Sequence, residues 1–321
     1  MIELQAAAPL PSGPEPEGTQ TSRVEPQAPD ARVTGSDRGG QEFRAERRKR
    51  PRLNATLVIG LVMVAVVLAI CALSFVWTPT DPLRTDPISR LQGPSGTHWL
   101  GTDGLGRDVL SQLIAGSRVP LLVGVVAVLI ATVVGVPWGI MAGMTGRGPG
   151  EWMMRWNDIV QAFPPLLLAI VFAAVFGAST WTAMVALGIG FAPGFARVAR
   201  SGTMQVMSRE FALAARASGR GPLFTAVRHV LPNILSIVIV QATVTFALAV
   251  LSEAALSFLG LGTPPPTPSW GRMLQESQVY IYNQPLLILW PGVAIAWTVL
   301  AFNLLGDGLR DQLDPRMKGA S

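Results

Sequence analysis

The sequence has very few of the side chains that cross-link proteins or bind metals. Its 321 residues include one cysteine, Cys71, and two histidines, His98 and His229. A single cysteine excludes a disulfide within the chain, and these three side chains are too few for a Cys/His zinc site. Asp103 and Asp108 lack the ligand spacing of an EF-hand calcium loop. We therefore expect no disulfide and no bound metal.

Charge is scarce as well, since charged residues make up 14% of the sequence and hydrophobic residues 50%, with a mean hydropathy of +0.41. Soluble proteins contain about 25% charged residues. Six apolar stretches reach the length of about 20 residues that crosses a bilayer, namely 55–77, 119–142, 159–177, 181–199, 234–258 and 285–305. The sequence therefore predicts an all-α integral membrane protein with six transmembrane helices.

The basic residues predict the orientation of these helices. With the N-terminus in the cytoplasm, 17 arginines and lysines near the spans face the cytoplasm and five face outside. This asymmetry favours an N-in, C-in arrangement. It makes 78–118 an outer loop, for which we expect an amphipathic helix capped by Asp108, and 311–321 a cytoplasmic C-terminus. Arg197 and Arg200 are interpreted as topology signals at a cytoplasmic helix end.

Residues 1–54 are expected to form a disordered cytoplasmic tail. The segment is rich in proline and poor in large apolar residues, so it cannot bury enough surface to offset its ordering entropy. It ends in a basic cluster at 44–52, which could bind anionic lipid or nucleic acid. We interpret the cluster as a topology anchor and expect no nucleic-acid partner.

The sequence offers no device for nucleotide chemistry. Its two lysines, Lys49 and Lys318, do not stand in a G-x-x-x-x-G-K-[ST] phosphate loop. No histidine lies in a span to act as the base for a nucleophile such as Ser201. We therefore expect no catalytic residues, no bound cofactor and no ATP hydrolysis by this chain.

Glu253 is the main ionisable residue within the predicted spans. It lies late in the fifth span and would either line a solute path or accept hydrogen bonds from a neighbouring helix. A proton-coupled carrier needs several acidic or histidine side chains at membrane depth, which this chain lacks.

Small residues recur at a spacing that allows close contact between membrane helices. Gly135, Gly139 and Gly143 follow one another at four-residue intervals, as do Gly190 and Gly194. In a chain with 33 glycines the same spacing also arises by chance. Helix interfaces and coincidence are therefore both open at these positions.

The cytoplasmic loop at 200–232 predicts two short helices separated by Gly219, Gly221 and Pro222. At helical spacing its first part places apolar residues on one face and arginines on another. The apolar face contains Met207, Phe211, Ala214 and Ser218. Such a helix suits a groove on a soluble partner, but it would equally lie on the anionic inner leaflet. The pattern leaves both possibilities open.

The same loop resembles a family motif. It contains Leu213-Ala214-Ala215, then Gly219, and then Leu231-Pro232 after eleven residues. This pattern is similar to the E-A-A-x3-G-x11-L-P loop of permease subunits in binding-protein-dependent ABC importers. Leu213 stands where the family has glutamate, and Glu210 lies one turn earlier. The resemblance implies a coupling helix that docks on an ATPase subunit through Met207, Phe211, Leu213, Ala214, Ala215, Arg216, Gly219, Leu231 and Pro232.

Three further segments are similar to the C-type permeases of dipeptide and oligopeptide importers. They are the G-T-D-x-x-G-R-D run at 101–108, the segment 253–271 with its P-T-P-S-W-G end, and the C-terminal stretch 303–316. The resemblance implies a permease core at 119–310. It also implies an outer gate or binding-protein docking surface made by Gly101, Thr102, Asp103, Gly106, Arg107, Asp108, Pro268, Trp270 and Gly271.

The resemblance implies a multi-pass protein of the cytoplasmic membrane that works within an assembly. The expected partners are a second, homologous permease subunit, two ATP-binding subunits, an extracytoplasmic substrate-binding protein and the lipid bilayer. The expected solute is a peptide, with glutathione or a nickel complex also open. The alternatives are a self-contained channel, an ion-coupled secondary carrier or a structural scaffold.

Overall fold

The computed structural model describes residues 54–146, 148–211 and 218–313, and every element named within them is helical. The predicted disordered tail, apart from Asn54, and much of the C-terminus lie outside these ranges. In chain order the elements are α1 (Ala55–Ser74), η1 (Pro87–Ser89), α2 (Val109–Ala115), α3 (Arg118–Met144), α4 (Pro149–Gln161), α5 (Pro165–Phe176), α6 (Thr180–Met207), α8 (Pro222–Thr225), the π-helix η2 (Ala226–Val230), α9 (Leu231–Phe258), α10 (Trp270–Ser277), η3 (Gln278–Tyr280) and α11 (Leu286–Leu313).

The predicted all-helical membrane fold is confirmed. Five helical segments are long and apolar enough to cross a membrane, and the pair α4 and α5 makes a sixth crossing if it counts as one. This pair bends by 71°. The bend lies at Pro164 and Pro165, where two backbone N–H groups are missing and helical geometry is disfavoured for the preceding residues. The sequence predicts one span over 159–177, whereas this stretch contains the end of α4, the bend and α5.

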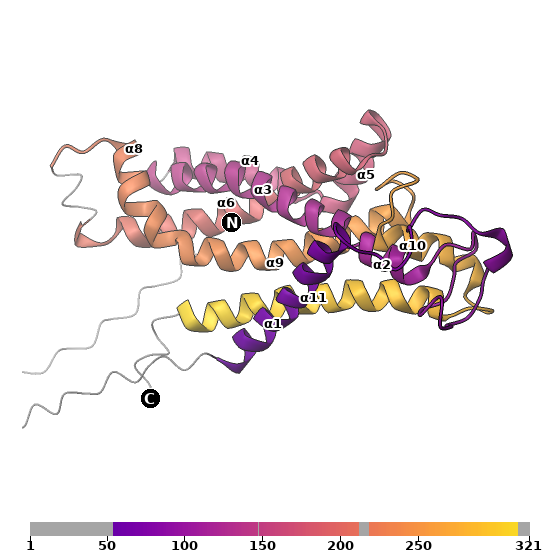
Figure 1. Cartoon of the computed structure of the whole chain (residues 1–321). Helices are drawn as coiled ribbons and strands as arrows, with labels where there is room; N and C mark the ends of the chain where they lie inside the picture. Colours follow the sequence, from indigo (N-terminus) through magenta and orange to yellow (C-terminus); the bar gives the residue numbers. More distant parts are fainter. Residues whose placement is uncertain (1–53, 147, 212–217, 314–321) are drawn as a thin grey trace, which may run out of the picture. The chain divides into compact units, whose positions relative to one another are not determined.

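Successive crossings run in opposite directions along the bundle (Figure 1). α8 lies at one end, and α2 and α10 lie at the other. The start of α1 and the end of α11 share the α8 end, where the side-chain amide Nδ2 of Asn54 donates to Oδ2 of Asp311 at 2.8 Å. An even number of crossings follows. Which end faces the cytoplasm stays a prediction.

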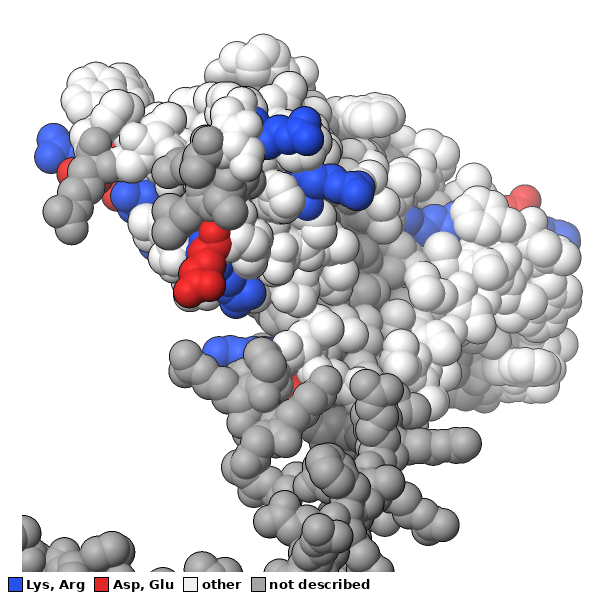
Figure 2. Space-filling view, turned by 90° about the vertical axis from the view of Figure 1, so that its left-hand side faces the viewer, with Lys and Arg blue, Asp and Glu red and all other residues white. Residues whose placement is uncertain are grey.

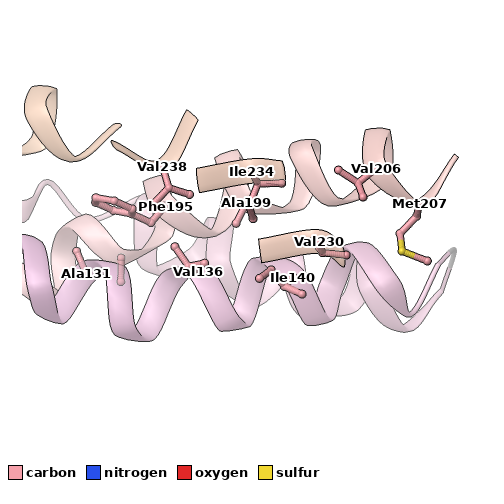
Figure 3. Close-up of a cluster of buried hydrophobic side chains, with 11 residues drawn as sticks. Ala131, Val136, Ile140, Phe195, Ala199, Val206, Met207, Val230, Ile234 and Val238 are labelled. Carbon is pink, nitrogen blue, oxygen red and sulfur yellow. The ribbon is translucent and has the colours of Figure 1, made fainter. Parts of the chain in front are cut away.

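α3, α6 and α9 pack together around a buried apolar cluster (Figure 3). Most of their buried side chains are small or branched, such as Ala131, Ile140 and Val238, and the Phe195 ring is buried among them. α3 and α6 approach closely because α3 presents glycines. A Cβ on Gly135 or Gly139 would meet the carbonyl oxygens of Ala192 and Ala196 in α6. The interpretation of these glycines as a helix interface is confirmed.

α1 packs mainly against α11. The two helices approach at two glycines, because a Cβ on Gly60 would lie 2.5 Å from the Leu305 backbone nitrogen and one on Gly308 would lie 2.5 Å from the Leu57 Cα. α11 is joined in turn to α9, where the rings of Phe246 and Phe302 stack with centroids 3.9 Å apart. The first and last helices are therefore neighbours.

Candidate functional site

The segment between α6 and α9 forms a surface at the α8 end of the bundle (Figure 1). The chain turns at Gly219, whose φ of 72° strongly favours a residue without a Cβ. This confirms the turn that we expected there. α8 and η2 then lead directly into α9, so that Leu231 and Pro232 are the first two residues of that helix.

Three rings and one guanidinium meet on this surface. The ring of Phe211 lies 6.1 Å from the His229 imidazole, and the Phe224 ring lies 5.8 Å from the same imidazole, measured between centroids. The guanidinium carbon of Arg220 stands 4.9 Å from the Phe224 ring centroid. Phe211 and Phe224 remain 40% and 43% exposed. We call these four residues the inner patch.

Basic side chains predominate at this end of the bundle. Figure 2 views this end of the bundle and shows more basic than acidic side chains on the described surface. Arg209 and Arg228 are both exposed close to the patch in sequence. Glu210 is also exposed beside Phe211 in the sequence. Exposed rings with basic neighbours suit an acidic partner surface with an apolar groove, and they also suit an anionic lipid surface.

The residues predicted for coupling do not all lie on this surface. Met207 is the last residue of α6 and is 8% exposed, because it packs in the central core (Figure 3). It therefore cannot belong to an exposed apolar ridge. Leu213, Ala214, Ala215 and Arg216 lie outside the described residues.

The opposite end of the bundle holds a network centred on Asp103. One oxygen of its carboxylate accepts from the backbone nitrogens of Leu105 and Arg107 at 2.8 and 2.9 Å. The other oxygen accepts from Nε of Arg107 at 2.7 Å and from Nε2 of Gln112 at 2.8 Å. Gly101 and Gly106, with φ of 82° and 74°, allow the loop to fold around this carboxylate.

Arg107 connects this loop to α10. Its guanidinium bonds Asp103 and also Glu276, which in turn accepts from Nε of Arg272 at 2.7 Å. Burial by itself lowers the pKa of Arg107, but the carboxylates of Asp103 and Glu276 outweigh that effect and raise the pKa above its ordinary value. A cavity of about 340 Å³ opens beside this network and is lined in part by Tyr280.

Asp108 caps α2, as predicted. Its Oδ2 accepts from the backbone nitrogen and the hydroxyl of Ser111 at 2.8 and 2.7 Å. Its Oδ1 lies 2.9 Å from Nδ1 of His98. Nearby, the hydrogen bonds that Asp86 accepts, first from the Ser89 hydroxyl and then from the Ile88 backbone, lower its pKa. The loop is thus fixed by short-range polar contacts.

The second outer segment packs onto the first. Ser269 caps α10, and the indole nitrogen of Trp270 donates to the Leu113 carbonyl at 2.9 Å. A Cβ on Gly271 would meet the Ala254 backbone of α9. The structure therefore brings together the predicted outer residues of 101–108 and Trp270 with Gly271, while Pro268 lies in the loop just before α10.

Glu253 is enclosed between α9 and this outer segment. It is 1% exposed, and its Oε1 accepts from the Ser257 hydroxyl at 2.6 Å. The same hydroxyl accepts from the Thr263 backbone nitrogen at 3.1 Å. Ser257 belongs to the same helix, and Oε2 of Glu253 has no hydrogen-bond partner among the described residues, so both roles that the sequence left open stay predictions.

One polar pair was missed by sequence reasoning. Arg197 of α6 donates to Asp158 of α4 at 2.7 Å. The expected third span began one residue after Asp158, and Arg197 was interpreted as a topology signal. α6 continues to Met207, so Arg197 does not stand at the end of the helix, and its role as a topology signal stays a prediction.

The chain matches known membrane proteins over the bundle. Residues 135–319 match the family described as the binding-protein-dependent transport system inner membrane component. This chain belongs to that family. It is thus a permease subunit of an ABC importer and a multi-pass protein of the inner membrane. The family match includes the inner patch and the Asp158–Arg197 pair.

Curated relatives of this permease cover most of its length. The dipeptide transport system permease protein of Alkalihalophilus pseudofirmus is 42% identical over 84% of this chain and 89% of its own. The di/tripeptide transport system permease protein of Pseudomonas aeruginosa is 41% identical over 82% and 89%. The nickel transport system permease protein of Escherichia coli is 38% identical over 81% and 94%.

A solved structure shares the fold of this permease. An inward-facing conformation of the MetNI methionine ABC transporter aligns with a TM-score of 0.53 and 20% identity, over 63% of this chain and 97% of its own. At this identity the likeness concerns the fold alone.

Proposed function

We propose that this permease and a second, homologous subunit form the path of an ATP-driven peptide importer. A substrate-binding protein delivers the peptide at the end that carries α2 and α10, and two ATP-binding subunits dock at the α8 end. The relatives named for dipeptide and di/tripeptide transport support a peptide as the solute. Family membership gives no support to a self-contained channel or an ion-coupled carrier.

The inner patch is the main support for the proposal that the ATP-binding subunits dock at the α8 end. Phe211 and Phe224 expose large rings beside Arg220, and aromatic and arginine side chains are the residue types enriched at interface hot spots. In this arrangement Phe211, Gly219 and the segment 213–216 make the contact, while Leu231 and Pro232 connect it to α9. Met207 supports the contact from the core.

The network around Asp103 supports the proposal that the binding protein docks at the end with α2 and α10. Asp103, Arg107 and Asp108 fix the loop 101–108, and the pair of Arg107 with Glu276 joins that loop to α10. Trp270 and Gly271 join α10 to α2 and α9. Gly101, Thr102, Gly106 and Pro268 shape the same surface. Most of these residues are buried, with Arg107 8% and Asp108 3% exposed, so in this proposal they fix the shape of the loop that a soluble protein recognises. Glu253 lies beneath it as a contact within the fold.

The test replaces Phe211 with alanine in the complete transporter. If Phe211 anchors the docking, truncating its ring costs about 2 kcal/mol or more, which weakens binding roughly 30-fold. We expect Phe211→Ala to reduce co-purification of the ATP-binding subunits and peptide-stimulated ATP hydrolysis. Leu213→Glu should have a mild effect, because it restores the residue that the family motif carries.

Phe258→Ala is the matched control. Phe258 is 39% exposed, close to the 40% of Phe211, but it ends α9 at the opposite end of the bundle. We expect it to keep both co-purification and ATP hydrolysis. Unchanged coupling in Phe211→Ala would contradict docking at the inner patch, and peptide uptake by this chain alone would support the carrier alternative.

A further inference from the structure

The cavity beside the Asp103 network lies at the end of the bundle that carries α2 and α10 (Figure 1). Its volume of about 340 Å³ is near the lower limit of the roughly 300–1,000 Å³ that is typical of small-ligand sites. Arg90 and Leu105 line the cavity and are exposed, so they stand at its rim. Its floor is made of buried side chains, namely Val109, Gln112, Met273, Ser277 and Leu287.

One positive charge of this cavity has no opposite charge beside it. A chain of ion pairs joins two carboxylates to two guanidiniums, so that its charges cancel, and it consists of Asp103, Arg107, Glu276 and Arg272. Both oxygens of Glu276 are occupied within this chain. Arg90 makes no ion pair within the described residues, and its charge is therefore left over.

Arg90 and Tyr280 meet at the cavity. Nη2 of Arg90 donates to the hydroxyl oxygen of Tyr280 at 3.1 Å, and this hydroxyl keeps its own proton for a second acceptor. The Tyr280 ring is packed against the loop 101–108, because a Cβ on Gly104 would overlap with it. Ser277 is 7% exposed, and its hydroxyl has no hydrogen-bond partner within the described residues. Three groups that can donate hydrogen bonds therefore line one cavity.

The backbone fixes the position of Arg90. The next residue, Leu91, has φ of 53°, a left-handed conformation that a side chain disfavours. Two contacts hold Leu91 there: its nitrogen donates to the Asp103 carbonyl at 3.1 Å, and its carbonyl accepts from Nε2 of Gln284 at 3.4 Å. Backbone strain of this kind persists only where the surrounding structure determines it, and it is concentrated at functional sites.

We propose that this cavity receives one acidic side chain of the substrate-binding protein. Arg90 and Tyr280 bind the carboxylate, and the apolar part of the floor packs against its aliphatic stem. The guanidinium suits a carboxylate because it offers two parallel N–H groups. The proposal rests on the proposed function. It adds to the docking surface two residues that lie outside the segments 101–108 and 268–271.

An acidic side chain suits the cavity better than a free peptide does. A peptide carries an ammonium as well as a carboxylate, and the ammonium would need a carboxylate in the cavity. Asp103 and Glu276 are both already paired with guanidiniums. An acidic side chain brings the carboxylate alone, and it matches the single positive charge that is left over at Arg90.

The test uses the complete transporter in proteoliposomes, the purified binding protein and a carbodiimide, which joins an amine directly to a carboxylate. The chain has lysines only at positions 49 and 318, so Arg90→Lys places an amine at the rim with no other lysine near it in the sequence. We expect Arg90→Lys to form a covalent adduct with the binding protein. Peptide mapping should place the new bond on a glutamate or aspartate of that protein.

Arg84→Lys is the matched control. Arg84 is exposed on the same segment between α1 and α2, and it does not line the cavity. We expect this variant to give about tenfold less adduct, since only groups that are held in contact react efficiently.

Binding measurements without the reagent separate contact with the binding protein from a structural role. Arg90→Gln should weaken binding of this protein about tenfold at low salt and less at high salt, because the lost contact is a charge-assisted hydrogen bond near the surface. Tyr280→Phe should weaken it about threefold, since it loses one neutral hydrogen bond. Both variants should keep the wild-type unfolding midpoint and the wild-type rate of ATP hydrolysis in the absence of binding protein.

Four results would overturn the inference. They are no adduct from Arg90→Lys, equal adduct from Arg84→Lys, a bond from the introduced lysine only to carboxylates of its own chain, and unchanged binding in Arg90→Gln. Binding of labelled dialanine to the transporter alone that is lost in Arg90→Gln would assign the cavity to the solute and would also overturn it. Absence of binding between the wild-type transporter and the binding protein would instead overturn the proposed function.

Discussion

Gly219 and Gly221 differ in backbone conformation although both have open space around them. Nothing lies within 4 Å of a Cβ built on either residue. Gly219 has φ of 72°, whereas Gly221 has φ of −62°, which any residue adopts. The two positions therefore separate the effect of backbone strain from the effect of side-chain size.

We expect Gly219→Leu to disturb the inner patch and Gly221→Leu to be tolerated. A branched side chain in the left-handed region costs roughly 1–2 kcal/mol, and the loop can relieve this cost by changing the path of the coupling segment. Peptide-stimulated ATP hydrolysis by the purified transporter should fall in Gly219→Leu and remain near wild type in Gly221→Leu. Equal activity in the two variants would show that the turn does not set the coupling geometry.

Individual residues were predictable where the cause is local. Asp108 before an apolar helix predicts a cap, and Gly219 beside a helix end predicts a turn, because both depend on a few neighbouring residues. The Asp158–Arg197 pair joins residues 39 apart in the chain, and a single sequence gives no signal for such a contact. Met207 was expected on an exposed ridge but is buried at the end of α6, and its part in coupling stays a prediction.

At the scale of elements, the glycines of α3 determine how closely α6 can approach. We expect Gly139→Ala to destabilise the transporter by roughly 1–3 kcal/mol, because its Cβ would meet the Ala196 carbonyl and lie 2.8 Å from the Ala199 Cβ. Gly292→Ala in α11 is the control, since nothing lies within 4 Å of its added Cβ and alanine favours helix. The thermal unfolding midpoint in detergent should fall for the first variant and not for the second.

The elements were predicted in type but not in extent. Apolar runs identify crossings because a bilayer demands helices of a given length. Hydropathy marks only the part of a helix that lies in the bilayer. The sequence therefore predicts a span that ends at 199, whereas α6 continues to Met207. The break between α4 and α5 could have been found from Pro164 and Pro165, which lie within the predicted span 159–177.

For the whole molecule, the orientation of the bundle is open to direct measurement. We expect cysteines at Thr85 and Thr267 to react with a membrane-impermeant thiol reagent in intact cells, and a cysteine at Ser208 to react only after lysis. All three residues are exposed, so burial within the chain does not protect them. The native Cys71 would first be replaced by serine. Labelling at Ser208 in intact cells would contradict the N-in, C-in arrangement.

The contact between α1 and α11 has a consequence for the order of events on the ribosome. Gly60 and Leu305 are 245 residues apart, and synthesis at 5–20 residues per second separates them by roughly 10–50 s. During that interval the first helix must remain in the bilayer without its main neighbour. Its 20 residues carry no charge, which makes it stable there alone. The contact between α1 and α11 is therefore made only after residue 305 has been synthesised.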